Sequence, residues 1–318
     1  MAALPKIRLK AEIPDDLKAE VAKTTWGKVL SITPVVMTVI ATMLAGLASS
    51  EMTSAQYDRS LAAQRQSKAG DQWNFFQGKK LRGVVLRSTL DTMGATTGIH
   101  PLDPAALRQA LAGTPAAAEM ETTAGRQALA ALTNGTLPKL PPAPPAAASV
   151  QAALTALEES RSDAELARLL VNIDGGPLDD ALRQAQAHAL ALDELTKPIG
   201  HAIDIWEKQL ARLAGNDALR RDFTAARLNY NATRYDSEAR LNQAIAGLFE
   251  LQVRKSNISA ERHHRRSSRF FYGMLAAQLG VIVSTLAMAA HQRSLLWAIA
   301  AGAGAVAIAF AVYVLVYV

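Results

Sequence analysis

The pair of residues best spaced for chemistry in this 318-residue sequence is Glu261 and His264, near the end of a long helical stretch. Their spacing of three puts a carboxylate and an imidazole on one face of a helix, as in carboxylate-bridged di-iron bundles. Those bundles need the motif twice, with two further Glu residues, and this chain has one copy beside an apolar segment. Glu261 and His264 are therefore weak candidates for a metal site, and contact with lipid headgroups is the competing interpretation.

Other chemical motifs do not stand out. The remaining histidines are scattered, and His263 cannot share a helix face with His264. We find no Gly-rich phosphate loop, no Ser-His-Asp order and no paired-acid motif. The chain also has no cysteine to serve as a nucleophile, a thiolate ligand or half of a disulfide. We therefore expect no catalytic residue and no cofactor, with an enzyme or metal-binding protein as an alternative hypothesis.

Three apolar segments are each long enough to cross a bilayer, which takes roughly 20 residues. They predict transmembrane helices at 29–49, 270–290 and 295–318, and none contains Asp, Glu, Lys or Arg. The last two are separated by a four-residue loop and form a predicted hairpin. Small residues recur every four positions there and allow close helix packing, either within the hairpin or between copies of the chain. The predicted packing residues are Gly273, Gly280, Gly302 and Gly304, together with Gln278, the most polar group in any span.

The net charge of +6 is concentrated beside these segments. Lysines precede the first span, within an N-terminal tail (1–28) that we expect to form an interfacial amphipathic helix. Four arginines precede the second span, namely Arg262, Arg265, Arg266 and Arg269. Anionic lipid headgroups are the expected partner of such clusters. Nucleic acid is not expected, because aromatic residues make up only 5% of the chain, too few for base stacking.

Between the spans the sequence predicts an all-α domain, because no stretch alternates as a strand does. A long outgoing stalk helix (50–94) leads to a small helical cap (95–197) that is rich in Ala and Pro. Within the cap we expect helices at 104–112, 116–133, 150–173 and 179–195, an extended linker (136–148) and a turn at 175–177. Lys197 and Pro198 are expected to open a return stalk helix (198–269), in which 215–217 is either a break or a stutter.

Helices of this length need partners, and apolar spacings of four and three predict a coiled-coil-like pairing of the two stalk helices. If Ser49 and Arg269 mark one membrane surface, antiparallel pairing places residue i near residue 318 − i. Trp73 then faces Ile245. The three cations Lys79, Lys80 and Arg82 then lie near the two acids Glu238 and Asp236.

An aromatic cluster, Trp73, Phe75 and Phe76, stands beside those cations and is a candidate interaction surface. The simplest function for it is to lock the helical hairpin, and a ligand or partner platform is the alternative. Phe75 and Phe76 point to different sides of the helix, so one of them is left for a second subunit or partner.

The stretch Asp71-Gln72-Trp73-Asn74-Phe75-Phe76-Gln77-Gly78-Lys79 resembles a bacterial family of membrane proteins with a domain of unknown function. Members show Asp-Gln-Trp, two aromatics and Gln-x-Lys after a first membrane helix, and end in a membrane hairpin. The likeness covers about 25–95 and 240–318, and 95–215 looks like an enlargement. This chain has Phe-Phe where Tyr is commoner in the family. The resemblance implies an architecture and no activity.

These features together predict an integral protein of the bacterial inner membrane, with three transmembrane helices, a helical stalk and a cap. Charge counting does not decide its orientation, and we expect a cytoplasmic N-terminus with 50–268 in the periplasm. The expected function is that of a non-catalytic scaffold or accessory subunit, which forms a homo-oligomer or joins a larger membrane complex. An oligomeric channel or transporter component is the first alternative.

Overall fold

The computed structural model describes residues 25–213, 215–289 and 293–317, and this part of the chain is all-helical, with no strands. It divides into a central unit, Ser60–Ser256, and a terminal unit, which holds the described residues of 1–59 and 257–318. The predicted N-terminal tail lies almost wholly outside the described residues, so its interfacial helix stays a prediction.

Two helices are far longer than the rest and run from one unit into the other. α2 (Thr25–Thr96) is continuous, with Pro34 inside it, and α9 (Asp217–Ala289) is continuous as well. Together with α10 (Arg293–Tyr317) they supply three helices that are long and apolar enough to cross a membrane, by length and composition. Both helices are rich in good helix formers. Pro34 lies near the start of α2 and does not interrupt it.

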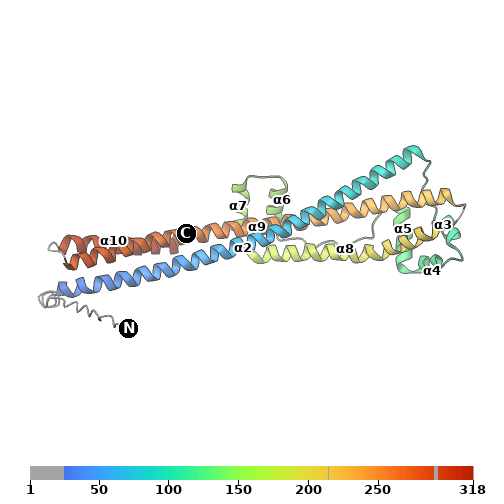
Figure 1. The fold of residues 1–318 in the computed structure, drawn as a ribbon. Coiled ribbons are helices and arrows are strands. Elements are labelled where there is room, and N and C mark those ends of the chain that lie inside the picture. Colours follow the sequence, from blue (N-terminus) through green and yellow to red (C-terminus); the bar gives the residue numbers. More distant parts are fainter. Residues whose placement is uncertain (1–24, 214, 290–292, 318) are drawn as a thin grey trace, which may run out of the picture. The chain divides into compact units, whose positions relative to one another are not determined.

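Short helices make up much of the rest of the central unit (Figure 1). They are α3 (Pro104–Leu111), α4 (Pro115–Glu121), α5 (Thr123–Asn134), α6 (Ala148–Glu158) and α7 (Asp163–Val171). The proline-rich stretch between α5 and α6 is not helical, as five prolines require.

Two predicted helices of the cap are each split in the structure. Thr122 ends α4 and caps α5, and its Oγ1 accepts a hydrogen bond from the Gly125 backbone at 2.8 Å. Gly125 fits only because it lacks a side chain, since a Cβ there would lie 1.9 Å from the Glu119 carbonyl oxygen. The second predicted helix, 150–173, is split at Ser160, whose φ of 53° is left-handed. Turn-forming hydroxyl residues thus override the helical periodicity at both places.

The expected return helix 198–269 is wrong as a single element. α8 (Gly175–Leu210) begins at the predicted turn and runs straight through Pro198, and α9 starts only at Asp217. Gly215 lies between them with a φ of +84°, a value that glycine adopts readily, so 215–217 is a real break. Pro177 is tolerated because it lies in the first turn of α8, where its missing N–H has no helical acceptor.

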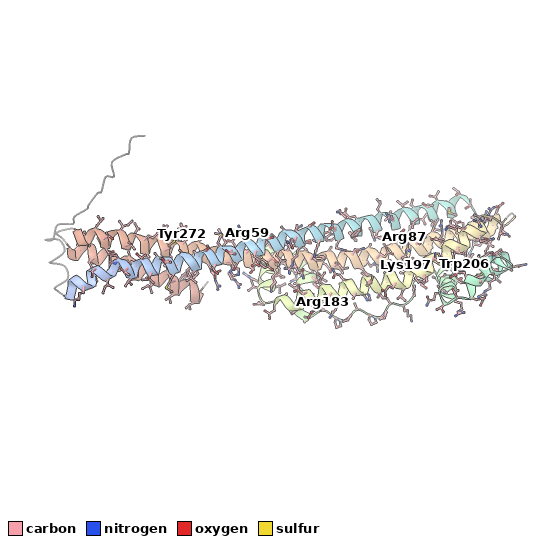
Figure 2. The ribbon with its side chains drawn as sticks, turned by 60° about the horizontal axis from the view of Figure 1, so that its bottom comes forward. Arg59, Arg87, Arg183, Lys197, Trp206 and Tyr272 are labelled. Atoms are coloured by element: carbon pink, nitrogen blue, oxygen red, sulfur yellow. The ribbon has the colours of Figure 1, made fainter. Side chains whose placement is uncertain are left out.

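α8 and α9 lie side by side within the central unit (Figure 1). Arg227 is paired with Glu207 near one end, and Gln252 Nε2 donates to Asp179 Oδ1 at 2.7 Å near the other. Pro198 removes one backbone hydrogen bond from the interior of α8. Packing offsets this loss, because α8 buries Ile199, Ile203 and Trp206 completely or nearly so. Figure 2 marks Trp206 on α8 beside the short helices, where it joins a core that also includes Phe223 and Tyr230.

Small buried residues recur at multiples of seven positions along both long helices, with Phe76 and Val253 at the two positions where the series has a larger residue. On α2, these residues are Ala41, Ala48 and Ala55 in the terminal unit and Ala62, Ala69 and Gly83 in the central unit. On α9, they are Ala232, Ala239 and Ala246 in the central unit and Ala260 and Ser267 in the terminal unit. A seven-residue period of buried positions is the pattern of coiled-coil packing, and small side chains allow two helices to approach closely.

Candidate functional site

One member of the aromatic cluster, Trp73, lines a cleft in the central unit. The Trp73 and Phe76 rings meet edge to face, with centroids 5.5 Å apart. Trp73 lines a cavity of about 500 Å³ whose apolar walls include Leu154 and Leu157 of α6 and Leu166 of α7. Gly247 of α9 also lines it, and a Cβ there would lie 3.5 Å from Leu154 Cδ2. This is an ordinary contact distance, so α6 packs directly against α9 at Gly247.

The rim of this cleft is charged but internally neutralised. Arg161 donates to Glu159 and Glu165, each at 2.7 Å, and hydrogen bonds to Glu165 and then Glu159 raise the pKa of Arg161. Arg254 pairs in the same way with Asp163 and Glu250. The cleft can thus hold an apolar or aromatic group, and its cations already have acidic partners.

Two of the three predicted cations contact the two acids assigned to them. Lys79 pairs with Glu238, and Lys80 Nζ lies 3.1 Å from Asp236 Oδ1. Arg82 lies over the Tyr235 ring instead, with its Cζ 6.0 Å from the ring centroid. Arg87, seven residues beyond Lys80 on the same side of α2, donates to Asp236 Oδ2 at 2.6 Å. Arg87 was not predicted as a partner of Asp236, although its distance of two helical turns from Lys80 places both on one side of the helix.

Asp236 pairs with two cations, Lys80 and Arg87, and its pKa is lowered. Its side chain is only 13% exposed, whereas those of Lys80 and Arg87 are about half exposed. Burial raises the pKa of Asp236, but hydrogen bonds from Lys80 and Arg87 outweigh it and hold the pKa below the usual value. Partners of Asp236 and Glu238 lie at 79–87 on α2, while Ser256 Oγ accepts from Arg65 at 2.8 Å.

Phe75 is the member of the aromatic cluster that the structure leaves open, at 56% exposed. Beside it, a row of exposed α2 residues is spaced alternately by three and four positions. We call this row the outer α2 face. The face consists of Gly78, Leu81, Val85, Ser88 and Thr92, all exposed and all uncharged. Leu81 and Val85 are 65% and 53% exposed. This face lies opposite the small buried residues of the same helix.

The terminal unit contains a polar cluster beside its apolar segments, centred on His263. His263 Nδ1 lies 2.6 Å from Glu51 Oε2, and its Nε2 lies 4.0 Å from Asp58. Arg266 also reaches Glu51, at 3.8 Å. The sequence alone does not indicate this cluster, because the partners of His263 are more than 200 positions away and only the fold brings them together.

The metal candidates Glu261 and His264 are not assembled into a site. Glu261 Oε1 accepts from Arg265 Nε at 2.8 Å, and this hydrogen bond from Arg265 lowers the pKa of Glu261. Within the described ranges, no group of three His, Cys, Asp and Glu side chains could hold a metal ion.

The small residues of the apolar segments pack largely within the chain. A Cβ at Gly273 would lie 3.3 Å from Leu44 Cδ1 of α2, and one at Gly280 would lie 3.4 Å from the Ala300 carbonyl oxygen of α10. Gly304 faces Met37 of α2. Gly302 has open space beside it and Gln278 is exposed, so these two predicted packing residues lie on the outside.

The chain matches one known family. The family described as Domain of unknown function (DUF4337) matches residues 26–131, about a third of the chain. The match contains α2 with the Asp71–Lys79 stretch, and it extends to residue 131. Residues 95–131 belong to the matched range, although the resemblance predicted that they are part of an enlargement. The predicted likeness over 240–318 lies outside the match. No curated protein and no solved structure matches the chain.

Proposed function

We propose that this protein is a non-catalytic scaffold of the bacterial inner membrane, which assembles with copies of itself through the outer α2 face. The observation that carries the proposal is this exposed, uncharged line on a helix that is otherwise rich in charge. Leu81 and Val85 lie at its centre, flanked by the exposed Phe75 and Val84. Contiguous exposed apolar surface of this kind is typical of interaction sites.

Membrane insertion is the first part of the proposal. The three long apolar helices expose many large aliphatic side chains within the terminal unit, among them Val35, Met43, Leu279 and Val306. In water these would cost free energy, whereas in a bilayer they meet hydrocarbon. We place the spans at 29–49, 270–290 and 295–318. We infer that α2 and α9 pair antiparallel between them, which the ion pairs at Lys79 and Lys80 support.

The second part is the identity of the partner, a second copy of this chain. Copies inserted in one membrane share one orientation, so their α2 helices lie parallel and present the same face to each other. Spacings of three and four suit parallel coiled-coil contacts, and an uncharged face avoids like-charge repulsion between identical helices. The same spacing, counted back along α2 into the terminal unit, falls on Ile32, Val36, Val39 and Met43, which are also exposed.

Mass measurement of the full chain in nanodiscs tests self-assembly. We expect a homogeneous oligomer for the wild type and a monomer for the double variant Leu81→Glu/Val85→Glu, since two charges per copy would be buried unpaired. The control is Val171→Glu/Leu190→Glu, which changes two equally exposed apolar residues elsewhere and should leave the oligomer intact. A monomeric wild type would refute the proposal, and stoichiometric co-purification of a larger complex would make the chain an accessory subunit instead.

Orientation is tested separately, with the advantage that the natural chain has no cysteine. We propose that the N-terminus is cytoplasmic and that 50–268 is periplasmic. In spheroplasts, a membrane-impermeant maleimide should therefore label the exposed position of Thr97→Cys. Labelling only after lysis would reverse the orientation.

An oligomeric channel is a second candidate, favoured by one observation. Gln278 and Thr285 are both exposed on α9 and lie seven residues apart, so one face of this apolar helix carries two polar groups. In an oligomer they would line either a contact or a weakly polar pore. Ion flux through liposomes that falls in Gln278→Leu, with the oligomer unchanged, would favour the pore. Absence of flux in the wild type would exclude it.

A further inference from the structure

Three of the four juxtamembrane arginines line one cavity in the terminal unit. Arg262, Arg265 and Arg269 surround an open cavity of about 600 Å³, together with Tyr313 of α10. Their spacing of three and four keeps them on one side of α9. The fourth arginine, Arg266, does not line this cavity, and its guanidinium lies 3.8 Å from Glu51. Tertiary structure therefore divides a cluster that looks uniform in the sequence.

This cavity carries an excess of positive charge. Glu261 is the acid that lines it, and it is paired with Arg265. Arg262 has no acidic partner in the part of the chain that the structure describes. The Arg269 guanidinium lies over the Tyr313 ring, 5.2 Å from its centroid, an arrangement that holds the side chain in place and leaves its N–H groups free to donate. A guanidinium group can bind a phosphate with two parallel N–H···O hydrogen bonds.

The cavity also lies at the edge of an apolar segment. Arg269 is followed directly by Phe270, where the second predicted span begins, and by Phe271 and Tyr272, which are 47% and 60% exposed. Figure 2 labels the position of Tyr272. Exposed aromatic residues at this point are typical of the headgroup level of a bilayer. Ile258 adds an apolar side chain to the lining.

We propose that Arg262, Arg265 and Arg269 form a binding site for the phosphate of an acidic phospholipid. The three guanidinium groups would hold the phosphodiester, while the acyl chains would extend along the exposed apolar surface that begins at Phe271. Free phosphate shares the first interaction but not the second, so the observations favour the lipid. This inference rests on the membrane insertion in the proposed function, and it adds a specific ligand.

Native mass spectrometry of the detergent-solubilised full chain, titrated with phosphatidylglycerol or phosphatidylcholine, tests the site. We expect phosphatidylglycerol to be retained preferentially. Each arginine beside an acidic lipid contributes roughly a five-fold preference, so Arg262→Gln/Arg265→Gln/Arg269→Gln should weaken retention about a hundred-fold. Two controls apply. Arg168→Gln/Arg183→Gln/Arg212→Gln removes the same charge from exposed positions of the central unit, and Arg266→Gln removes the neighbouring arginine outside the cavity.

Retention that is equal for both lipids, or unchanged in the triple variant, would overturn the proposal. Displacement of the lipid by millimolar inorganic phosphate would also overturn it and assign the cavity to free phosphate. Nanodiscs of neutral lipid distinguish a failure of the phosphate site from a failure of the proposed function. A chain that does not enter nanodiscs of neutral lipid refutes membrane insertion, whereas one that enters them but shows no preference for acidic lipid refutes only the phosphate site.

Discussion

Close approach of α9 to α2 at Gly83 gives the sharpest prediction about the central unit. Gly83 is buried on α2, and a Cβ at this position would lie 3.6 Å from the Ala232 carbonyl oxygen and 3.8 Å from Tyr235 Cβ. These are ordinary contact distances, so alanine fits without displacing α9. Leucine adds three further carbons beyond Cβ, and we expect them to crowd these neighbours on α9. The control position is Gly70 on the same helix, which has no atom within 4 Å of its built Cβ.

The comparison of Ala with Leu at each position removes the helix-propensity term, because these two residues differ little in propensity. Overpacking costs about 1–3 kcal/mol, so Gly83→Leu should be less stable than Gly83→Ala by about that amount. Gly70→Leu and Gly70→Ala should differ by less than about 0.5 kcal/mol, as is usual for open surface positions. Both alanine variants should gain up to about 1 kcal/mol over glycine.

Native-state hydrogen exchange of the full chain, followed in peptides of α2, measures the local opening free energy directly. A difference of 1–3 kcal/mol corresponds to amides that exchange about 5- to 150-fold faster in Gly83→Leu than in Gly83→Ala. The two variants of Gly70 should exchange within about two- to three-fold of each other. Equal exchange in the two variants of Gly83 would show that α9 does not contact α2 there, and the small-residue packing of the central unit would be refuted with it.

Two further predictions concern single side chains of the same unit. The pKa of Asp236 is held below its usual value of about 3.9, so Asp236 stabilises the fold above that pH and loses its contribution as the pH falls further. Asp236→Asn should abolish that acid sensitivity in pH-dependent thermal unfolding, and an unchanged pH profile would contradict the assignment. Tyr230 is fully buried, burial raises its pKa to about 12, and its hydroxyl has no protein hydrogen-bond partner among the described residues. Tyr230→Phe should leave the free energy of unfolding unchanged or raise it by about 1 kcal/mol at most, as measured by thermal unfolding, whereas a clear loss of stability would reveal a bound water or another partner.

Much of the architecture could be predicted because it depends on local properties of the sequence. Stretches rich in good helix formers predicted that α2 continues beyond its apolar segment and that α9 runs on into its own, and apolar length predicted three helices that could cross a membrane. The ion pairs of Lys79 and Lys80 followed from a simple count of residues from an assumed common level. Helix rise is constant, so a register error of a few residues still brings the right charges together.

Helix ends were predicted less well, because they depend on single residues whose effect is set by context. Pro198 looked like a helix start, yet it lies inside α8, where burial of Ile199, Ile203 and Trp206 offsets the lost hydrogen bond. The consequence is large, since one expected return helix becomes two helices that lie side by side.

The sequence by itself determined the helical class, the apolar segments and the places where charge accumulates, because composition and periodicity act within a few turns of one helix. Only tertiary structure decided which face of each helix is covered. It separated Arg266 from the three arginines of the cavity, brought Glu51 to His263, and left Leu81 and Val85 exposed while alanines of the same helix are buried. These distinctions depend on partners far away in the chain, and a residue's spacing along one helix carries no information about which neighbour will pack against it.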